Sequence, residues 1–288
     1  GLLQPAASEQ MKGDYLPKII AGELQGAFAY LERQSRYEMT DVVTRADNNG
    51  GKWVLNGEKT VVLNGGAAEK LIVLARNAGQ QSEEAGLTLF LVDASSSGVQ
   101  RTVYRMTDGQ EAATLLFKDV QVEGVIGAVG DGYALMAPII DDARLAICAN
   151  ALGAMEALNE KTLEYCKTRE QFGVAIGSFQ ALQHRMVDMF GACENVKSLL
   201  LRAVCAAQNA DADARRSVLA LKVMAGRAGR LIGGEAIQLH GGMGMTDELS
   251  IGFFVKRLMI INSLFGDADY HQQLFVALVN APASSAAA

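Results

Sequence analysis

The sequence predicts an α+β protein in which an antiparallel β-barrel or sandwich domain precedes an antiparallel four-helix bundle. Between residues 27 and 125, short runs rich in β-branched and aromatic residues alternate with turn residues. From residue 133 onward, apolar residues recur with the 3.6-residue period of amphipathic helices. Because strands and helices are segregated rather than alternating, a parallel sheet of the Rossmann type is excluded.

Residues 1–22 are predicted to form one amphipathic helix, which starts near Ser8, ends near Gly22 and is interrupted by Pro17. A single helix cannot bury its apolar face without a partner. We therefore expect these residues to be the end of an N-terminal helical domain that is largely absent from this sequence.

Residues 23–126 are predicted to form the β domain. The dipeptide Asn56-Gly57 separates two of its strand-like runs and predicts a two-residue hairpin, because both central residues of such a turn need a positive φ. Strands joined so tightly run antiparallel. The strand-like runs are residues 52–55, 60–63, 71–75 and 87–92.

Residues 127–280 are predicted to form the helical bundle, and residues 281–288 a flexible, low-complexity tail. Ser178 and Asp213 are expected to be helix N-caps, since their side-chain oxygens can accept hydrogen bonds from free backbone N–H groups. Gly241-Gly242 is expected to end the third long helix as a glycine C-cap. The helices are expected at residues 133–167, 178–209, 213–239 and 249–264, with a last segment near 267–279.

The charge balance argues against a nucleic-acid or anionic-membrane partner. The 288 residues carry a net charge of -6 without a long block of like charges, whereas phosphate-rich partners select basic surfaces. No apolar run is long enough for a membrane span, and residues 1–10 lack the pattern of a signal peptide. We therefore expect a cytoplasmic protein that acts on small molecules.

The four cysteines, Cys148, Cys166, Cys193 and Cys205, all lie in the predicted helices. Their spacing matches neither a CxxC motif nor a Cys/His metal-ligand pattern. We interpret them as reduced, buried packing residues and expect no metal site.

Two segments in the helical half have the residue types that hold a nucleotide cofactor. Residues 169–173 (REQFG) place a cation and an aromatic ring at one helix end, and residues 238–244 (QLHGGMG) leave backbone uncovered at another. A guanidinium pairs bidentately with phosphate oxygens, and exposed N–H groups bind anions. The segments together predict a site for a diphosphate that carries an adenine. The simpler alternative is a helix-ending salt bridge and an ordinary glycine cap.

Several motifs follow one another along the chain: LNGEK at 55–59, NGG at 64–66, TREQFG at 168–173, GSFQALQHR at 177–185, and the run from Ile237 to Met245. Together with the order of the domains, they resemble the acyl-CoA dehydrogenase family over nearly all of the chain. This resemblance implies FAD as cofactor and removal of the α and β hydrogens of an acyl-CoA thioester. It also implies a dimer or tetramer, because each FAD lies between the β domain of one subunit and the bundle of its neighbour.

The resemblance implies a role for each residue type in the two cofactor segments. Arg169 would pair with the FAD diphosphate, and Phe172 would pack on the nucleotide. Gln238, Gly241 and Gly242 would present polar side-chain and backbone groups to it. These residues form the expected FAD-binding set.

Arg144 matches an arginine that lies near the acyl-CoA in the family, so the resemblance implies substrate binding. Taken alone, it would be a surface arginine paired with Asp141, three residues earlier on the same helix. His184 and His240 belong to family motifs, and we expect them to be structural hydrogen-bonding residues.

The catalytic base is missing from both positions where the family carries it. Proton removal α to a thioester needs a carboxylate held against the substrate. The family has a glutamate in the loop before the last helix, where this chain has Phe265, or on the first long helix, where it has Ala143. Asp142 and Asp267 stand one residue away and are the remaining candidates, although one residue turns a helical side chain by about 100°.

The residues expected to face the flavin ring are also altered. Family members commonly have a threonine before the position of Glu32 and an aromatic-x-threonine before that of Asn64. This chain has Leu31, Val61 and Leu63 at those places. Each lost hydroxyl removes a hydrogen bond of roughly 1 kcal/mol and changes how the ring is held.

Residues 30–38 and 265–271 resemble the small-subunit type of bacterial acyl-CoA dehydrogenases, related to pimeloyl-CoA and steroid side-chain dehydrogenases. Such a chain would work with a large, base-bearing subunit, whose FAD site its bundle would complete. Two alternatives stay open: a self-sufficient dehydrogenase with Asp142 or Asp267 as base, and a non-catalytic scaffold or acyl-CoA-binding homo-oligomer. Family members commonly pass electrons to an electron-transfer flavoprotein, and the sequence does not specify the acyl chain.

Overall fold

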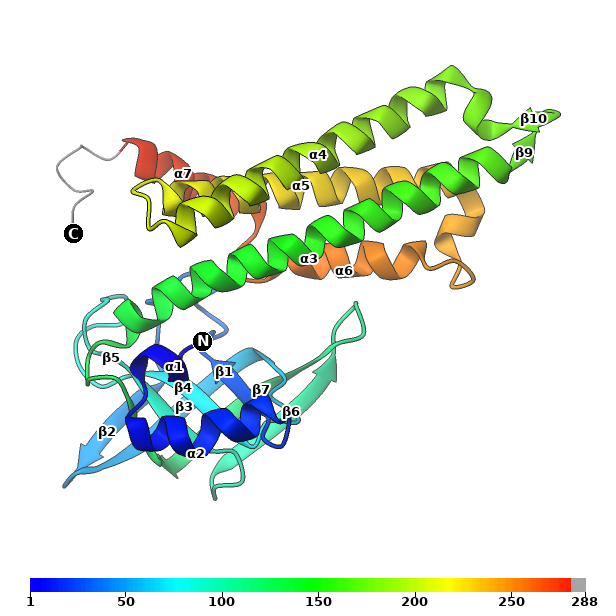
Figure 1. Cartoon of the computed structure of the whole chain (residues 1–288). Coiled ribbons are helices and arrows are strands. Elements are labelled where there is room, and N and C mark those ends of the chain that lie inside the picture. Colours follow the sequence, from blue (N-terminus) through cyan, green and yellow to red (C-terminus); the bar gives the residue numbers. More distant parts are fainter. Residues whose placement is uncertain (281–288) are drawn as a thin grey trace. The chain divides into compact units, whose positions relative to one another are not determined.

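The computed structural model describes residues 1–280 as a chain of two compact units (Figure 1). The division falls between Ile140 and Asp141, inside the long helix α3 (Gly132–Thr168). The tail expected at residues 281–288 lies outside the described residues.

Two helices, α1 (Leu3–Ala6) and α2 (Glu9–Ile20), open the first unit. The Oγ atom of Ser8 accepts a hydrogen bond of 3.2 Å from the N–H group of Met11, which caps α2 as its sequence suggests. The expected interruption at Pro17 is wrong, because the helix continues through it to Ile20. Proline lacks an N–H group, so α2 gives up one hydrogen bond there without ending.

The β domain is one eight-stranded, mainly antiparallel sheet in the order β6-β7-β3-β2-β4-β5-β8, with β1 paired in parallel to β4. Alternate side chains of the central strands form its core, which includes Leu55, Phe90 and Phe117. The predicted antiparallel β domain is thus confirmed. The strands are β1 (Gly26–Ala29), β2 (Arg45–Asn49), β3 (Lys52–Leu63), β4 (Lys70–Arg76), β5 (Leu87–Asp93), β6 (Val99–Arg105), β7 (Glu111–Gln121) and β8 (Gly124–Ile126).

The hairpin predicted at Asn56-Gly57 is wrong, because both residues lie inside the continuous strand β3. The register between β3 and β7 shifts between Leu55 and Gly57, so the glycine marks an irregularity in the ladder rather than a turn. Gly57 has a φ of 149°, and a Cβ atom there would come within 2.6–2.8 Å of Thr44. The side chain of Asn56 bonds across the sheet to Asp119, at 3.0 Å and 2.8 Å.

The second unit contains the helical bundle, with α4 (Gln180–Gln208), α5 (Ala214–His240), α6 (Ile251–Ser263) and α7 (Ala268–Asn280) beside most of α3 (Figure 1). Buried residues from four of these helices, such as Met155, Val196, Ile232 and Leu258, form one core. Each such side chain contributes roughly 1.5–3 kcal/mol when buried. Among the described residues, no helix combines the length and apolar character that a membrane crossing requires.

Two of the three expected caps of the bundle helices differ in the structure. Phe179, not Ser178, precedes α4, and the hydroxyl of Ser178 donates to the backbone oxygen of Ala175 at 2.7 Å. Asp213 precedes α5, but its carboxylate accepts from Arg216 at 2.6 Å rather than from a backbone N–H group. Gly241 is the C-cap of α5, as predicted, with a φ of 58°.

Three of the four cysteines are buried, as expected, but Cys205 is exposed near the end of α4. Burial raises the pKa of the Cys148 and Cys193 thiols to about 11. These two thiols therefore stay protonated and unreactive at neutral pH. The apolar periodicity around Cys205 is the reason that it was expected to be buried.

We predict that Gly57→Ala destabilises the β domain by at least ~3 kcal/mol, because the new Cβ atom would collide with Thr44 in addition to straining the backbone. Gly50→Ala is the matched control, since Gly50 also has a positive φ, of 64°, but faces open space. It should cost about 1 kcal/mol. The only tryptophan, Trp53, lies in β3, so its fluorescence during urea unfolding follows this unit. Equal losses of stability in Gly57→Ala and Gly50→Ala would contradict the steric explanation.

Candidate functional site

The first cofactor segment follows the C-terminus of α3 as a short hairpin of β9 (Glu170–Gln171) and β10 (Val174–Ala175). Phe172 and Gly173 form its turn, with φ values of 55° and 83°, which is why a glycine follows the aromatic residue. The turn holds the Phe172 side chain out in solvent, where 92% of the residue's surface is exposed. Such an exposed aromatic ring is available to pack on a ligand or on another chain.

The second cofactor segment is joined to the first by Tyr165 and His240. The two rings stack with centroids 4.3 Å apart, and the Tyr165 hydroxyl donates to the backbone oxygen of His240 at 3.4 Å. Tyr165 lies one turn before Arg169, and His240 directly precedes Gly241. The structure therefore brings the β9–β10 hairpin and the C-terminus of α5 to one end of the bundle (Figure 1). The hairpin region carries Arg169 and Phe172, and the end of α5 carries Gln238, Gly241 and Gly242.

This end of the bundle fits a phosphate-bearing nucleotide. The exposed guanidinium of Arg169 forms no ion pair with any residue in the described part of the chain. Gly241 and Gly242 are exposed, and a Cβ atom on either would meet no atom within 4 Å. A cation, an aromatic ring and uncovered backbone are thus presented together, which is the chemistry that a diphosphate and an adenine need.

Arg144 belongs to a separate site near the other end of its helix. A rise of 1.5 Å per residue places it ~30 Å along the axis from Tyr165. Its side chain is buried, with 4% exposed, and its Nη1 atom donates to Asp141 at 2.6 Å. Its Nε atom donates to the backbone oxygen of Phe265 at 3.1 Å. Arg144 is therefore not a surface arginine, and it holds the loop in which the family carries its base.

That loop, residues 264–267, is fixed by side chains that bond to its backbone and to the end of α6. Lys222 is buried, and its Nζ atom donates to the backbone oxygens of Ile261 and Asn262, each at 2.9 Å. The Nδ1 atom of His271 bonds to the backbone oxygen of Asp267 at 2.8 Å. Phe265 has a φ of 58°, and a Cβ atom on Gly266 would collide with His271.

Asp267 and Asp142, the two candidates for the catalytic base, differ in their contacts and exposure. An oxygen of Asp267 accepts from the N–H group of Tyr270 at 2.9 Å, so this carboxylate caps α7. Asp142 is exposed on α3, while Ala143 is partly buried. The partly buried Phe265 occupies the loop position, and its ring cannot accept a proton.

The groups under the loop have pKa values shifted by burial. Burial and the nearby Arg144 together lower the pKa of Lys222 to about 8, whereas Cys148 and Asp267 oppose the shift. Burial also lowers the pKa of His271 to about 4, and the cations Arg144 and Lys222 act in the same direction. His271 is therefore neutral at pH 7, and its Nδ1 atom carries the proton that it donates to Asp267. Its Nε2 atom is buried without a hydrogen-bond partner among the described residues.

Sequence reasoning missed Lys222, His271 and Tyr165. Lys222 follows the apolar Leu221 on the face of α5 that also buries Ala225 and Gly229, so the helical period alone would have marked it as a buried cation. Tyr165 has no comparable signal, because its partner His240 lies on another helix. His271 has none either, although its backbone partner Asp267 lies only four residues earlier.

Two family models match the chain. The model described as the acyl-CoA dehydrogenase C-terminal domain matches residues 130–277, and the model of the middle domain matches residues 27–123. The chain belongs to the acyl-CoA dehydrogenase family. This confirms the resemblance seen in its motifs and the division into a β domain and a helical bundle.

Individual relatives agree with this assignment. The chain is similar to mitochondrial isovaleryl-CoA dehydrogenase from Solanum tuberosum, with 30% identity over 254 residues, which cover 86% of this chain and 61% of the relative. The structure of butyryl-CoA dehydrogenase from Megasphaera elsdenii gives a TM-score of 0.89 at 25% identity, covering 96% of this chain and 73% of that one. A structure of PigA with FAD and proline gives a TM-score of 0.91 at 26% identity, with coverages of 96% and 73%. The chain spans about three fifths of the length of the curated relatives it matches.

We predict that His271 makes the bundle less stable in acid. Its pKa is about 4 in the folded chain and 6.5 when unperturbed, so the unfolded state binds the extra proton between these values. The free energy of unfolding has its full value above pH 6.5 and decreases by ~3 kcal/mol as the pH falls to 4. Helical circular dichroism during urea unfolding at several pH values measures it.

His271→Gln should flatten this pH dependence, since the glutamine amide can still donate to Asp267 but takes up no proton. His184→Gln is the control, because His184 is exposed on α4 and should leave the pH dependence unchanged. An unchanged slope in His271→Gln would show that another group causes the loss of stability in acid.

Proposed function

We propose that this chain is a subunit of an FAD-dependent acyl-CoA dehydrogenase that takes part in the α,β-dehydrogenation of an acyl-CoA thioester. The observation that carries the proposal is the end of the bundle where the exposed guanidinium of Arg169, the exposed ring of Phe172 and the exposed glycines Gly241 and Gly242 lie together. Membership of the family and similarity to proteins named as acyl-CoA dehydrogenases support the same reaction. The structure of PigA, which is similar to this chain, was determined with FAD, and this supports FAD as the cofactor.

The positions of the two sites favour FAD shared between subunits. The Arg169 end and the loop held by Arg144 are separated by ~30 Å along α3, so they are two half-sites rather than one pocket. We therefore infer that the Arg169 end binds the diphosphate and adenine of an FAD whose ring lies against another subunit. The ring of the flavin that belongs to this chain would lie against Leu31, Val61 and Leu63 of its β domain.

The loop at Phe265 supports the proposal that a partner subunit supplies the base. Arg144, Lys222 and His271 hold the backbone of this region, yet the side chain they position is a phenyl ring. Asp267 is used as a helix cap and Asp142 is exposed. A base-bearing partner in a heterotetramer accounts for both facts, and Asp142 or Asp267 remains the source of the base if the chain acts alone.

Bound FAD would supply the acceptor for the hydride that leaves the β carbon. The residues of this chain would act by binding and positioning. Arg169 would neutralise the diphosphate charge, and Phe172 would cover the nucleotide. Arg144 would set the loop beside the acyl group, where a glutamate in place of Phe265 would face the α carbon. Electrons would then pass to a partner such as an electron-transfer flavoprotein.

Arg169→Ala should reduce the FAD retained by the purified assembly at least tenfold, because a charge-assisted, bidentate contact contributes about 1.5–3 kcal/mol. The chain is expressed alone and with the base-bearing subunit, and FAD per chain is read from the visible spectrum. Arg202→Ala is the control, since Arg202 is also exposed but lies far along α4. Full FAD retention in Arg169→Ala would remove the main support for the proposal.

Phe265→Glu should give the chain a base that it lacks. We expect exchange of the α proton of an acyl-CoA into heavy water to rise at least ~100-fold, which is the usual contribution of a positioned base. Phe265→Gln has nearly the same shape without a base and should show no gain. If the unaltered chain by itself already exchanges the proton and reduces its flavin, and Asp267→Asn or Asp142→Asn stops it, the chain is a self-sufficient dehydrogenase.

A further inference from the structure

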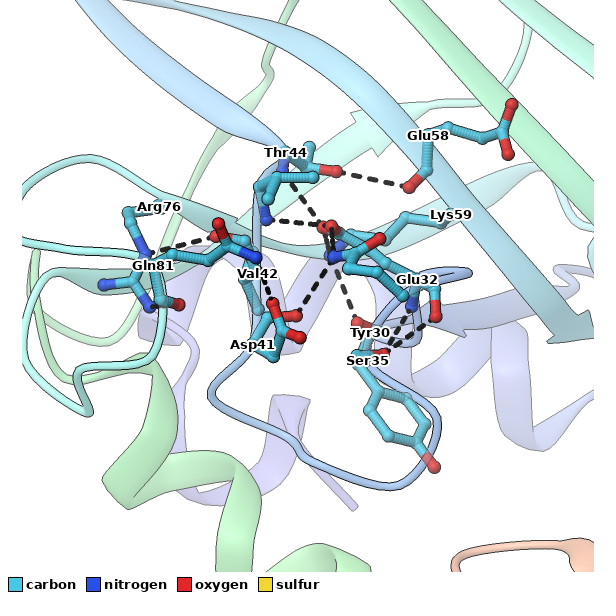
Figure 2. A network of polar contacts seen from close by, with 12 residues as sticks. Tyr30, Glu32, Ser35, Asp41, Val42, Thr44, Glu58, Lys59, Arg76 and Gln81 are labelled. Atoms are coloured by element: carbon cyan, nitrogen blue, oxygen red, sulfur yellow. Dashed lines mark hydrogen bonds and ion pairs between the residues drawn. The ribbon is translucent and has the colours of Figure 1, made fainter.

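The segment that joins β1 to β2, residues 30–44, has neither helix nor strand and is closed by one buried carboxylate. Glu32 accepts a hydrogen bond from the N–H group of Thr44 at 3.0 Å (Figure 2). It accepts another from the N–H group of Val43 at 2.8 Å, and both residues lie at the far end of the segment. It also accepts from the side chain of Gln34 at 2.8 Å. The carboxylate therefore ties the start of the segment to its end.

Lys59 of β3 completes the set of donors around Glu32. Its Nζ atom donates to the carboxylate at 2.7 Å and to the backbone oxygen of Tyr30 at 3.1 Å (Figure 2). The side chains of Lys59 and Glu32 are 0% and 1% exposed. Burial lowers the pKa of Lys59, and the carboxylate of Glu32 opposes this shift. Burial by itself would raise the pKa of Glu32, but Lys59 and the hydrogen bonds hold this pKa below its ordinary value. Each charge thus needs the other.

A second buried cation fixes the rest of the segment independently. Arg76 donates to the backbone oxygens of Thr40 and Val42 at 2.9 Å and 3.2 Å, and its remaining N–H groups bond to a neighbouring loop. The Glu32–Lys59 pair is therefore the part of the network that decides where the beginning of the segment, at Leu31, lies.

The same pair lies beside a strained part of β3. Val61 has a φ of 50°, which is costly for a β-branched residue, and the register of β3 against β7 shifts between Lys59 and Val62. The N–H group of Thr60 donates to the backbone oxygen of Leu31 at 2.9 Å, which couples this irregular stretch to the segment. Leu31 and Leu63 are partly exposed, and Val61 is exposed. Strain of this kind gathers where backbone is shaped for a ligand rather than for stability.

We propose that Glu32 and Lys59 are positioning residues, which hold Leu31 and Val61 as an apolar wall for the flavin ring bound by the β domain of this chain. The assignment of the ring to this wall rests on the proposed function, whereas the positioning of the wall rests on the contacts alone. Neither charged group touches the ring. They act through the backbone at Tyr30, Leu31 and Thr60, which sets the angle and distance of the wall.

The experiment compares four forms of the full chain in its flavin-bound assembly: the unaltered chain, Lys59→Met, Val61→Gly and the control Lys70→Met. Lys70 also forms ion pairs in this sheet, with Asp93 and Glu123, but lies away from the segment. FAD retention and the visible circular dichroism of the bound flavin report the position of the wall formed by Leu31 and Val61. Urea unfolding, followed by Trp53 fluorescence, reports stability.

Lys59→Met and Val61→Gly should each change the visible circular dichroism and lower FAD retention about tenfold, which corresponds to 1.4 kcal/mol. Val61→Gly removes backbone strain and should not lower stability, so its effect on the flavin separates positioning from folding. Lys70→Met should leave the flavin signal unchanged. If Lys59→Met fails to fold, the double variant E32Q/K59M removes both charges together and replaces it.

Hydrogen exchange of the chain without flavin tests the contacts separately. We expect the N–H groups of Val43, Thr44 and Thr60 to lose roughly tenfold or more of their protection in Lys59→Met, but not in Lys70→Met. An unchanged flavin signal in Lys59→Met would overturn the proposal, whatever the signal of Val61→Gly. If the unaltered chain retains no FAD in any assembly, the proposed function and the flavin wall both fail, and the exchange rates alone decide whether the pair positions the segment.

Discussion

Buried charged side chains satisfy the backbone groups of the irregular segments in this chain. Backbone N–H and C=O groups buried away from water need hydrogen-bond partners, and segments without helix or strand cannot supply them internally. Arg76 and Lys222 donate to backbone oxygens, and Glu32 accepts from backbone N–H groups. This constraint explains why charged residues lie in the interior of a protein with ordinary apolar cores: they hold loops in place, and the loops are where the candidate sites lie.

The loop at residues 264–267 is supported by side chains that lie outside it. Arg144 and His271 bond to the backbone around Phe265, so the geometry of this loop depends little on the side chain at that position. The supporting residues are thus physically separable from the side chain at position 265, and the loop holds its shape with a phenyl ring there.

The bundle end near Arg169 has the opposite character. Within the described residues the Arg169 guanidinium forms no ion pair, and the Phe172 ring, which contacts Phe179 edge to face, is mostly exposed. Stacking between Tyr165 and His240 joins two helix ends, and the groups carried by those ends point into solvent. An exposed phenyl ring and an exposed guanidinium gain little by facing water. The two regions of the second unit therefore differ physically: one is closed by internal hydrogen bonds, and the other is exposed.

The sequence by itself determined the α+β class, the helix bounds to within a few residues and the cap at Gly241. These features depend on the period of apolar side chains and on the conformational freedom of glycine, both of which act over a few neighbouring residues. Only the tertiary structure decided that Asn56-Gly57 lies inside a strand, since the pairing of β3 with β7 and the contact with Thr44 involve residues far away in the sequence. For the same reason the roles of Lys222 and the Glu32–Lys59 pair emerged from the fold: a buried charge is explained by its partner, and chain packing chooses that partner.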